Sequence, residues 1–255
     1  MRITRSIVPN LFTLVNLYMG FTAIVYIANE HYEYGAICVL IAAIFDMLDG
    51  VVARLIDAAS EFGVELDSLC DAVSFGIAPS FMLYKVHFYV YQDIGILLAS
   101  LPALAGVIRL ARFNIKLESL EDKKYFVGLP IPSAALTILT YIMFFHNESH
   151  LSEEAKACLI CIVAIVCSLA MVSNIKFANL PRYSLNYIKN NKFSFSVFNL
   201  AIIAIVISKG FLIFPLMLLY IFLSSLLHFI NWLRTKHEID DDFDDSEDEE
   251  FNIYE

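Results

Sequence analysis

Four aspartates within a stretch of 26 residues, Asp46, Asp49, Asp67 and Asp71, lie in or beside segments that are otherwise strongly apolar. A charged side chain at the centre of a membrane helix costs roughly 2.5–3.5 kcal/mol, even on the scale that penalises it least. Four aspartates would therefore cost on the order of 10 kcal/mol unless cations, water or a place near the membrane surface offset their charge. A cost of that size indicates a functional site.

Helical spacing brings these carboxylates together. Residues on a helix advance by about 100° each, so one face carries Asp46, Asp49, Gly50 and Ala53. Asp67 and Asp71 are four residues apart and share a face of the next helix. Two adjacent helices can thus direct four carboxylates into one pocket, where like charges this close cannot all stay ionised without cations.

The ligand types favour particular ions and a particular chemistry. Oxygen ligands without Cys or His select hard cations, so we expect Mg²⁺ or Mn²⁺, bound as a pair of ions. Two metal ions can stabilise both the attacking and the leaving oxygen of a phosphoryl group. The same carboxylates would also suit a cation transporter or a proton relay, and spacing alone leaves these alternatives open.

Small and basic residues beside the carboxylates fit the same site. Gly50 and Ala53 would let a bulky ligand or a neighbouring helix approach the backbone closely. Arg54, at the helix end, can bind phosphate oxygens with its planar guanidinium. It can equally anchor the helix end at the membrane surface, and the sequence does not separate these roles.

The elements that must position this site are membrane helices. The chain has 255 residues, of which 59% are hydrophobic, and a mean hydropathy of +0.68, which is too apolar for an ordinary soluble domain. We predict an all-α polytopic membrane protein with eight spans, at residues 9–28, 35–56, 66–86, 93–113, 131–146, 156–173, 195–209 and 211–232. The seventh is short and only Lys209-Gly210 separates it from the eighth, so a single re-entrant hairpin is the alternative.

The distribution of charge predicts the topology. If the N-terminus is inside the cell, 14 of the 17 Lys and Arg residues face the cytoplasm, so we expect both termini there. Eleven of the 27 acidic residues lie within Glu238–Glu255, which leaves 16 acids against 17 basic residues in the rest of the chain. The net charge of −10 therefore describes an acidic tail that we expect to be disordered and solvated. No nucleic-acid partner is expected.

The stretch from Asp46 to Asp71 reads D-x2-D-G-x2-A-R-x8-G-x3-D-x3-D and resembles the signature of the CDP-alcohol phosphatidyltransferases. The resemblance implies an enzyme of phospholipid biosynthesis that transfers a phosphatidyl group from a CDP-lipid to an alcohol and releases CMP. It also implies that the four aspartates hold two metal ions and that Asp71 is the general base toward the acceptor hydroxyl. The residues of this stretch that would contact the CDP-lipid are Gly50, Ala53, Arg54, Ser60 and Gly63.

The first span carries a polar face of its own. Asn10, Thr13 and Asn16 follow one another at intervals of three residues. In the family, a similar N-terminal stretch lines the nucleotide pocket, which adds Asn10 and Thr13 to the expected donor contacts. For Asn16, a hydrogen bond between helices is an equal alternative.

Two later blocks bear on the acceptor. R-L-A-R-F-N at residues 109–114 and F-x-G-L-P-x-P at residues 126–132 resemble blocks of bacterial-type phosphatidylserine synthases. That resemblance implies CDP-diacylglycerol as donor and L-serine as acceptor, with Arg109, Arg112 and Gly128 binding the serine; an Arg fork suits its carboxylate. Glycerol 3-phosphate, inositol or choline as acceptor and an archaeal-type lipid donor stay open. So do plain structural roles for these residues: anchors at the membrane surface for the arginines and a loop-to-helix entry for the glycine.

The resemblance also predicts the organisation of the chain. Residues 1–192 would form a core of six helices like that of the family, residues 193–236 an added C-terminal hairpin, and residues 237–255 the acidic tail. It implies a homodimer in the cell (inner) membrane, with the active site facing the cytoplasm.

Overall fold

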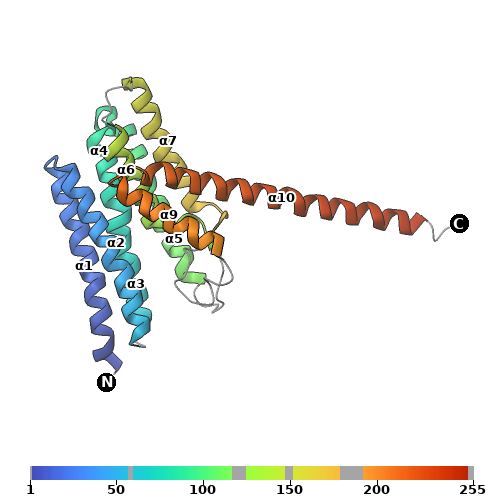
Figure 1. Cartoon of the computed structure of the whole chain (residues 1–255), viewed down its shortest axis with the longest axis horizontal. Helices are drawn as coiled ribbons and strands as arrows, with labels where there is room; N and C mark the ends of the chain where they lie inside the picture. The colour runs from blue at the N-terminus through green and yellow to red at the C-terminus, as the bar shows by residue number, and fades with distance from the viewer. Residues whose placement is uncertain (1, 57–59, 117–124, 147–151, 179–191, 252–255) are drawn as a thin grey trace.

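The computed structural model describes residues 2–56, 60–116, 125–146, 152–178 and 192–251, which form a bundle of helices (Figure 1). The helical elements are α1 (Arg2–Ala28), α2 (Tyr32–Leu55), α3 (Glu61–Asp71), η1 (Ala72–Ile77), α4 (Ala78–Val86), η2 (Phe88–Tyr91), α5 (Gln92–Lys116), α6 (Ile131–Tyr141), η3 (Ile142–His146), α7 (Glu153–Val172), α9 (Lys192–Ile207) and α10 (Ile213–Phe251). Two strands of three residues each, β1 (Tyr125–Val127) and β2 (Lys176–Ala178), pair antiparallel. The predicted all-α class is confirmed, and the short ribbon is an addition that the sequence did not indicate.

Six of the described helices are long and apolar enough to cross a membrane: Ile7–Ala28, Tyr32–Leu55, Glu61–Val86, Phe88–Ile115, Glu153–Val172 and Ile213–Leu233. The protein is therefore an integral membrane protein. The predicted fifth and seventh spans correspond to Ile131–His146 and to α9, and both are shorter. A helix of 16 residues such as α9 rises about 24 Å, less than the roughly 30 Å of a bilayer core. Eight full spans are thus not confirmed.

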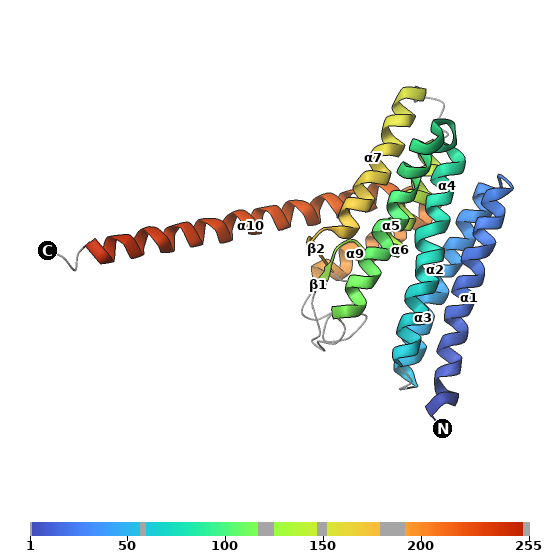
Figure 2. The same ribbon diagram turned by 180° about the vertical axis from the view of Figure 1, so that it is seen from behind.

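The C-terminal helices leave the direction of the bundle. Figures 1 and 2 show α10 running at a large angle to α1 and α2 and projecting away from them. The predicted tight turn between α9 and α10 is present, with Lys209 at φ 52° and Gly210 at φ 91°. The start of α10 packs on η3 and on β2 through the ring pairs Phe145–Phe214, at 4.9 Å, and Phe177–Tyr220, at 5.5 Å.

The acidic tail differs from the sequence expectation. We expected residues 237–255 to be disordered, whereas α10 continues as a helix to Phe251. Once a helix has formed, each further residue adds a hydrogen bond without a new nucleation cost, so an apolar helix can propagate into a polar segment.

Helix α5 packs with one face against η1, α4 and α7. The largest buried apolar side chains around it come from several elements, among them Met82 and Leu83 of α4, Ile138 of α6 and Ile160 of α7. Most of the buried apolar side chains therefore lie on the α4–α7 side, whereas α1 packs along the α3–η1–α4 helix and α2 packs mainly on α1 (Figure 1).

A very close contact fixes α1 against η1. The Ser74 hydroxyl donates a hydrogen bond to the Asn16 carbonyl at 3.0 Å. A Cβ atom placed on Gly20 would lie 2.2 Å from Ser74 Oγ and 2.8 Å from Ser74 Cα, far inside van der Waals contact. Only glycine allows this approach, which fixes the position of the polar face of α1 along the axis of α3.

We predict that Gly20→Ala destabilises the protein by about 1–3 kcal/mol, because the added methyl group must push α1 away from η1. Thermal unfolding of the detergent-solubilised protein measures the effect. Gly76→Ala is the matched control, since its nearest neighbour would be Ala103 Cα at an ordinary 3.6 Å. Equal melting temperatures for Gly20→Ala and the unsubstituted protein would contradict the close packing described here.

Candidate active site

Three of the four aspartates converge. One carboxylate oxygen each from Asp46 and Asp49 of α2 and from Asp67 of α3 lie within 4.8 Å of one another. Asp49 is buried, and the other two side chains are half-buried. Asp67 Oδ1 is itself buried and has no hydrogen-bond partner among the described residues. The convergence predicted from helical spacing is confirmed for these three residues.

Asp71 borders this cluster one turn further along. Its side chain is buried, and its carboxyl group lies within hydrogen-bonding reach of that of Asp46. The three-oxygen cluster does not include it. Asn16 of α1 donates from Nδ2 to Asp71 Oδ1 at 3.0 Å, which holds one carboxyl oxygen and leaves the other free of that contact.

Helix α1 supplies the hydrogen-bond donors for the carboxylates. Thr13 Oγ1 donates to Asp49 Oδ2 at 2.7 Å, and Thr13 and Asn16 are both buried between the helices. The sequence left open whether Asn16 lines the pocket or makes a hydrogen bond between helices. The structure shows the hydrogen bond, and its acceptor is a member of the aspartate group.

The carboxylates fit a hard divalent cation. The ligand atoms are all oxygens, and among the described residues no Lys, Arg or His forms an ion pair within 4 Å of these aspartates. Partly buried carboxylates this close together need a cation between them, and oxygen-only sites favour Mg²⁺ or Mn²⁺. The unpartnered Asp67 oxygen is directly available as a ligand.

Three of the predicted donor contacts meet at the start of α3. Ser60 Oγ accepts a hydrogen bond from the Gly63 N–H at 3.1 Å and so caps the helix. A Cβ atom on Gly63 would lie 3.1 Å from Ser60 Oγ and 3.2 Å from Asn10 Oδ1. Glycine thus lets α3 begin close to the polar face of α1.

The α2 side of the site is open. A Cβ atom on Gly50 would meet nothing within 4 Å, so there is free space beside Asp49. Ala53 is half-buried one turn along. Arg54 is exposed and donates from Nε to the Gly50 carbonyl at 3.0 Å, so its side chain lies along its own helix rather than over the aspartates.

Of the predicted acceptor contacts, Arg109 lies within electrostatic range of Asp71. Its side chain is 9% exposed, and its buried Nε has no hydrogen-bond partner in the described part of the chain. Ser68 Oγ donates to Asn114 Oδ1 at 3.2 Å and ties α3 to the end of α5. No pattern in the sequence predicts this contact, although Asn114 closes the block that contains Arg109.

Arg112 and Gly128 make contacts with the end of α7 instead. Arg112 Nη1 donates to the Val172 carbonyl at 2.7 Å. Gly128 has a φ of 80°, and a Cβ atom on it would lie 2.4 Å from the Met171 carbonyl oxygen. Both residues therefore hold the α7 terminus, and no described contact joins them to the aspartates.

Comparison with known proteins shows the family of this chain. A model of the CDP-alcohol phosphatidyltransferases matches residues 6–170, which include every aspartate of the site. The chain belongs to the CDP-alcohol phosphatidyltransferase family. The family is metal-dependent, in agreement with an acidic cluster that can hold an ion.

Similar proteins come from bacteria and archaea. The chain is 36% identical over 178 residues to a CDP-diacylglycerol–serine O-phosphatidyltransferase of Helicobacter pylori, covering 70% of this chain and 74% of the relative. It is 31% identical over 187 residues to the Bacillus subtilis protein of the same name, covering 73% and 98%. An archaetidylserine synthase of Methanothermobacter thermautotrophicus is 36% identical over 172 residues, covering 66% and 68%.

The hydrogen bond from Thr13 to Asp49 yields a prediction about metal affinity. Thr13→Val keeps the side-chain shape but removes the donor, so the Mn²⁺ concentration for half-maximal activity should rise by about 10–100-fold. Thr22→Val is the control, because the exposed Thr22 hydroxyl donates only to the Tyr18 carbonyl of its own helix. An unchanged Mn²⁺ requirement in Thr13→Val would show that this contact does not orient a metal ligand.

Proposed function

We propose that this protein synthesises phosphatidylserine, by transferring the phosphatidyl group of CDP-diacylglycerol to the hydroxyl of L-serine with release of CMP. The observation that carries the acceptor is Arg109, a buried guanidinium with an unpartnered Nε beside Asp71. A buried cation next to a candidate base suits a small substrate with a carboxylate and a hydroxyl group. The names of the bacterial relatives support the same acceptor.

Asp46, Asp49, Asp67 and Asp71 would hold Mg²⁺ or Mn²⁺, as a pair of ions, on the carboxylate oxygens. When bound, the metal supplies positive charge that neutralises the diphosphate of the donor and stabilises the oxygens entering and leaving the phosphorus. Thr13 and Asn16 keep the carboxylates in place through hydrogen bonds, so that little reorganisation is needed during the reaction.

Asp71 acts as the general base. Asn16 binds one of its carboxyl oxygens, and the other takes the proton of the serine hydroxyl. The serine oxygen then bonds to the phosphorus that carries diacylglycerol, and the bond from this phosphorus to the CMP oxygen breaks with its electron pair leaving on CMP. Arg109 binds the serine carboxylate and so places the hydroxyl near Asp71. Arg112 and Gly128, the other predicted serine contacts, support this site from the α7 side.

The donor occupies the space between α1, α2 and the start of α3, with its acyl chains in the bilayer. The open volume beside Gly50 and the meeting of Asn10, Ser60 and Gly63 support this placement. The residues proposed to contact the CDP-lipid are Asn10, Thr13, Gly50, Ala53, Arg54, Ser60 and Gly63. Arg54 now donates to the Gly50 carbonyl, and it would bind the donor by giving up this contact and donating to a phosphate oxygen instead.

The excess of basic residues on one side supports an active site that faces the cytoplasm, with both termini there and the protein in the cell (inner) membrane. Within this arrangement, residues 1–192 form the family core, residues 193–236 a C-terminal hairpin that is inserted in the membrane, and residues 237–255 an acidic tail. The family resemblance supports a homodimer.

The proposed function is tested by release of CMP. Purified protein with CDP-diacylglycerol, serine and Mn²⁺ should release CMP, whereas glycerol 3-phosphate, inositol and choline should not support release. Asp71→Asn should abolish turnover, and Asp93→Asn, an exposed aspartate on α5, should leave it unchanged. If no acceptor leads to release of CMP and the protein carries metal ions across liposome membranes, a cation transporter is favoured instead.

The same assay compares two donors. The similarity to an archaetidylserine synthase makes a CDP-linked archaeal-type lipid a second candidate donor. Faster release of CMP from that lipid than from CDP-diacylglycerol would change the donor and keep the acceptor.

The role of Arg109 predicts a selective kinetic effect. Arg109→Gln should raise the KM for serine at least about tenfold and leave the KM for the CDP-lipid nearly unchanged, because it removes a charged hydrogen bond to the acceptor alone. Arg112→Gln is the comparison, since this arginine binds the Val172 carbonyl and its loss should lower stability rather than serine affinity. A larger rise in KM for serine in Arg112→Gln than in Arg109→Gln would reverse the assignment.

A further inference from the structure

A second polar cavity lies at the end of the bundle opposite the aspartates. It has a volume of about 1120 Å³ and is lined by the α1–α2 turn, the end of α4, η2, the end of η3 and the start of α7. Its titratable lining residues include His87, His146 and Glu153. The aspartate site lies at the other ends of these helices, so the proposed phosphatidyl transfer uses none of the three residues.

Two histidines in this cavity lie ring to ring, and each has one buried nitrogen that is unpartnered among the described residues. His146 is 6% exposed, and its Nδ1 is buried without a partner among the described residues. His87 Nε2 is likewise buried and unpartnered. The ring centroids are 5.4 Å apart with the planes at 84°. Tyr91 packs against His87 at 5.6 Å and Tyr141 against His146 at 5.8 Å, so aromatic contacts hold both rings in place.

The spacing of the two rings suits one shared metal ion. Two imidazoles on a tetrahedral zinc ion, each with a Zn–N bond of about 2.0–2.1 Å, have ring centres about 5 Å apart. Burying ring nitrogens without partners is costly, and a metal ion between them would satisfy both at once. A single imidazole could find this compensation in water, but two rings in contact, each with a buried unpartnered nitrogen, can share one ligand.

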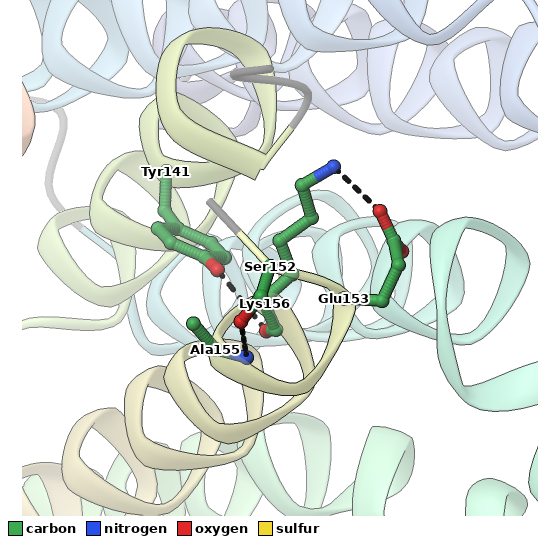
Figure 3. A network of polar contacts seen from close by, with 5 residues as sticks. All are labelled: Tyr141, Ser152, Glu153, Ala155 and Lys156. Carbon is green, nitrogen blue, oxygen red and sulfur yellow. Dashed lines mark hydrogen bonds and ion pairs between the residues drawn. The ribbon is translucent and has the colours of Figure 1, made fainter. Parts of the chain in front are cut away.

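A carboxylate is placed at the rim of the same cavity. Figure 3 shows Glu153 at the start of α7, where its Oε1 accepts a hydrogen bond from Lys156 Nζ at 2.8 Å. The position of this turn is fixed, because Ser152 caps the helix by accepting from the Ala155 N–H at 3.2 Å and Tyr141 donates to the Lys156 carbonyl at 3.4 Å.

The Glu153 carboxylate is within electrostatic range of both histidines. The Glu153 side chain is 88% exposed, so its ion pair with Lys156 contributes little to stability. The carboxylate can therefore leave Lys156 and bind a metal ion. The positive charge of Lys156 disfavours a second cation at this place, so replacing Lys156 tests whether a metal ion binds here.

We propose that His87 and His146 bind a borderline transition-metal ion such as Zn²⁺, distinct from the hard-cation site of the aspartates. The ligand atoms of His87, His146 and Glu153 do not all lie within 4.8 Å of one another, so Glu153 becomes the third ligand when its carboxylate releases Lys156 and turns toward the rings. Imidazole nitrogen selects Zn²⁺ and its neighbours over Mg²⁺, whereas the aspartate cluster has the opposite preference. The ion joins the junction of α4 and η2, which carries His87, to the end of η3 and the start of α7. In the topology proposed above, the site opens to the outside of the cell.

The test is a calorimetric titration with Zn²⁺ alone on the detergent-solubilised protein. The protein is prepared without a polyhistidine tag, and excess Mg²⁺ is added to occupy the aspartate carboxylates. We expect one saturable site per chain. His87→Ala and His146→Ala should each weaken Zn²⁺ binding at least about tenfold, since removing a ligand costs no less than removing an outer-shell partner. His228→Ala, a histidine on α10 outside the cavity, should bind Zn²⁺ as the unsubstituted protein does.

Two further variants keep the proposal testable if a histidine variant does not fold. Glu153→Gln should weaken Zn²⁺ binding, whereas Lys156→Gln should strengthen it, because it removes a competing cation and frees the carboxylate. Substituting Co²⁺ should give ligand-field bands of a nitrogen–oxygen site without a thiolate charge-transfer band. Absence of saturable binding, Zn²⁺ affinity in the two histidine variants equal to that of the unsubstituted protein, or a thiolate band that places the ion at cysteine would overturn the proposal.

Discussion

The mutual repulsion of carboxylates in an apolar bundle is the constraint on which the structure of the active site depends. Oxygens of Asp46, Asp49 and Asp67 lie within 4.8 Å of one another on two helices that both pack against α1, and Asp71 lies near Asp46. Such a cluster is unfavourable unless cations and hydrogen-bond donors compensate it. The elements around it can be understood as the parts that make this compensation available.

Helix α1 carries much of that compensation. Its hydroxyl and amide groups donate to carboxyl oxygens on both α2 and α3, and the close approach at Gly20 fixes its height against Ser74. If α1 packed loosely, Thr13 and Asn16 would lose their hydrogen bonds to Asp49 and Asp71, and all four buried groups would be unpaired. Packing at one point and hydrogen bonding at another are thus two parts of the same requirement, since rigid donors are what allows charge to be stabilised without reorganisation.

The two ends of the bundle offer different ligands. At one end the ligands are oxygens alone, beside a buried arginine; at the other, two imidazoles and an exposed carboxylate surround a cavity. The difference in hardness between these ligands means that the two sites need not compete for the same ion. The successive helices α3, η1 and α4 run from one region to the other, and α5 returns from the cavity to Arg109.

Much of the aspartate site could be predicted from the sequence. The cost of buried charge marked Asp46–Asp71 as functional, and apolar runs predicted most of the spans, because these properties are local. Helical spacing predicted that four carboxylates share one pocket, and three of them, Asp46, Asp49 and Asp67, converge. Contacts between distant segments decided the rest. Arg109 and Arg112 are equivalent in sequence terms, yet one lies beside Asp71 and the other binds Val172, since α5 turns one toward α3 and the other toward α7. The position of Gly128, the direction of α10 and the pairing of His87 with His146 likewise depend on packing between residues far apart in the chain, which no local pattern encodes.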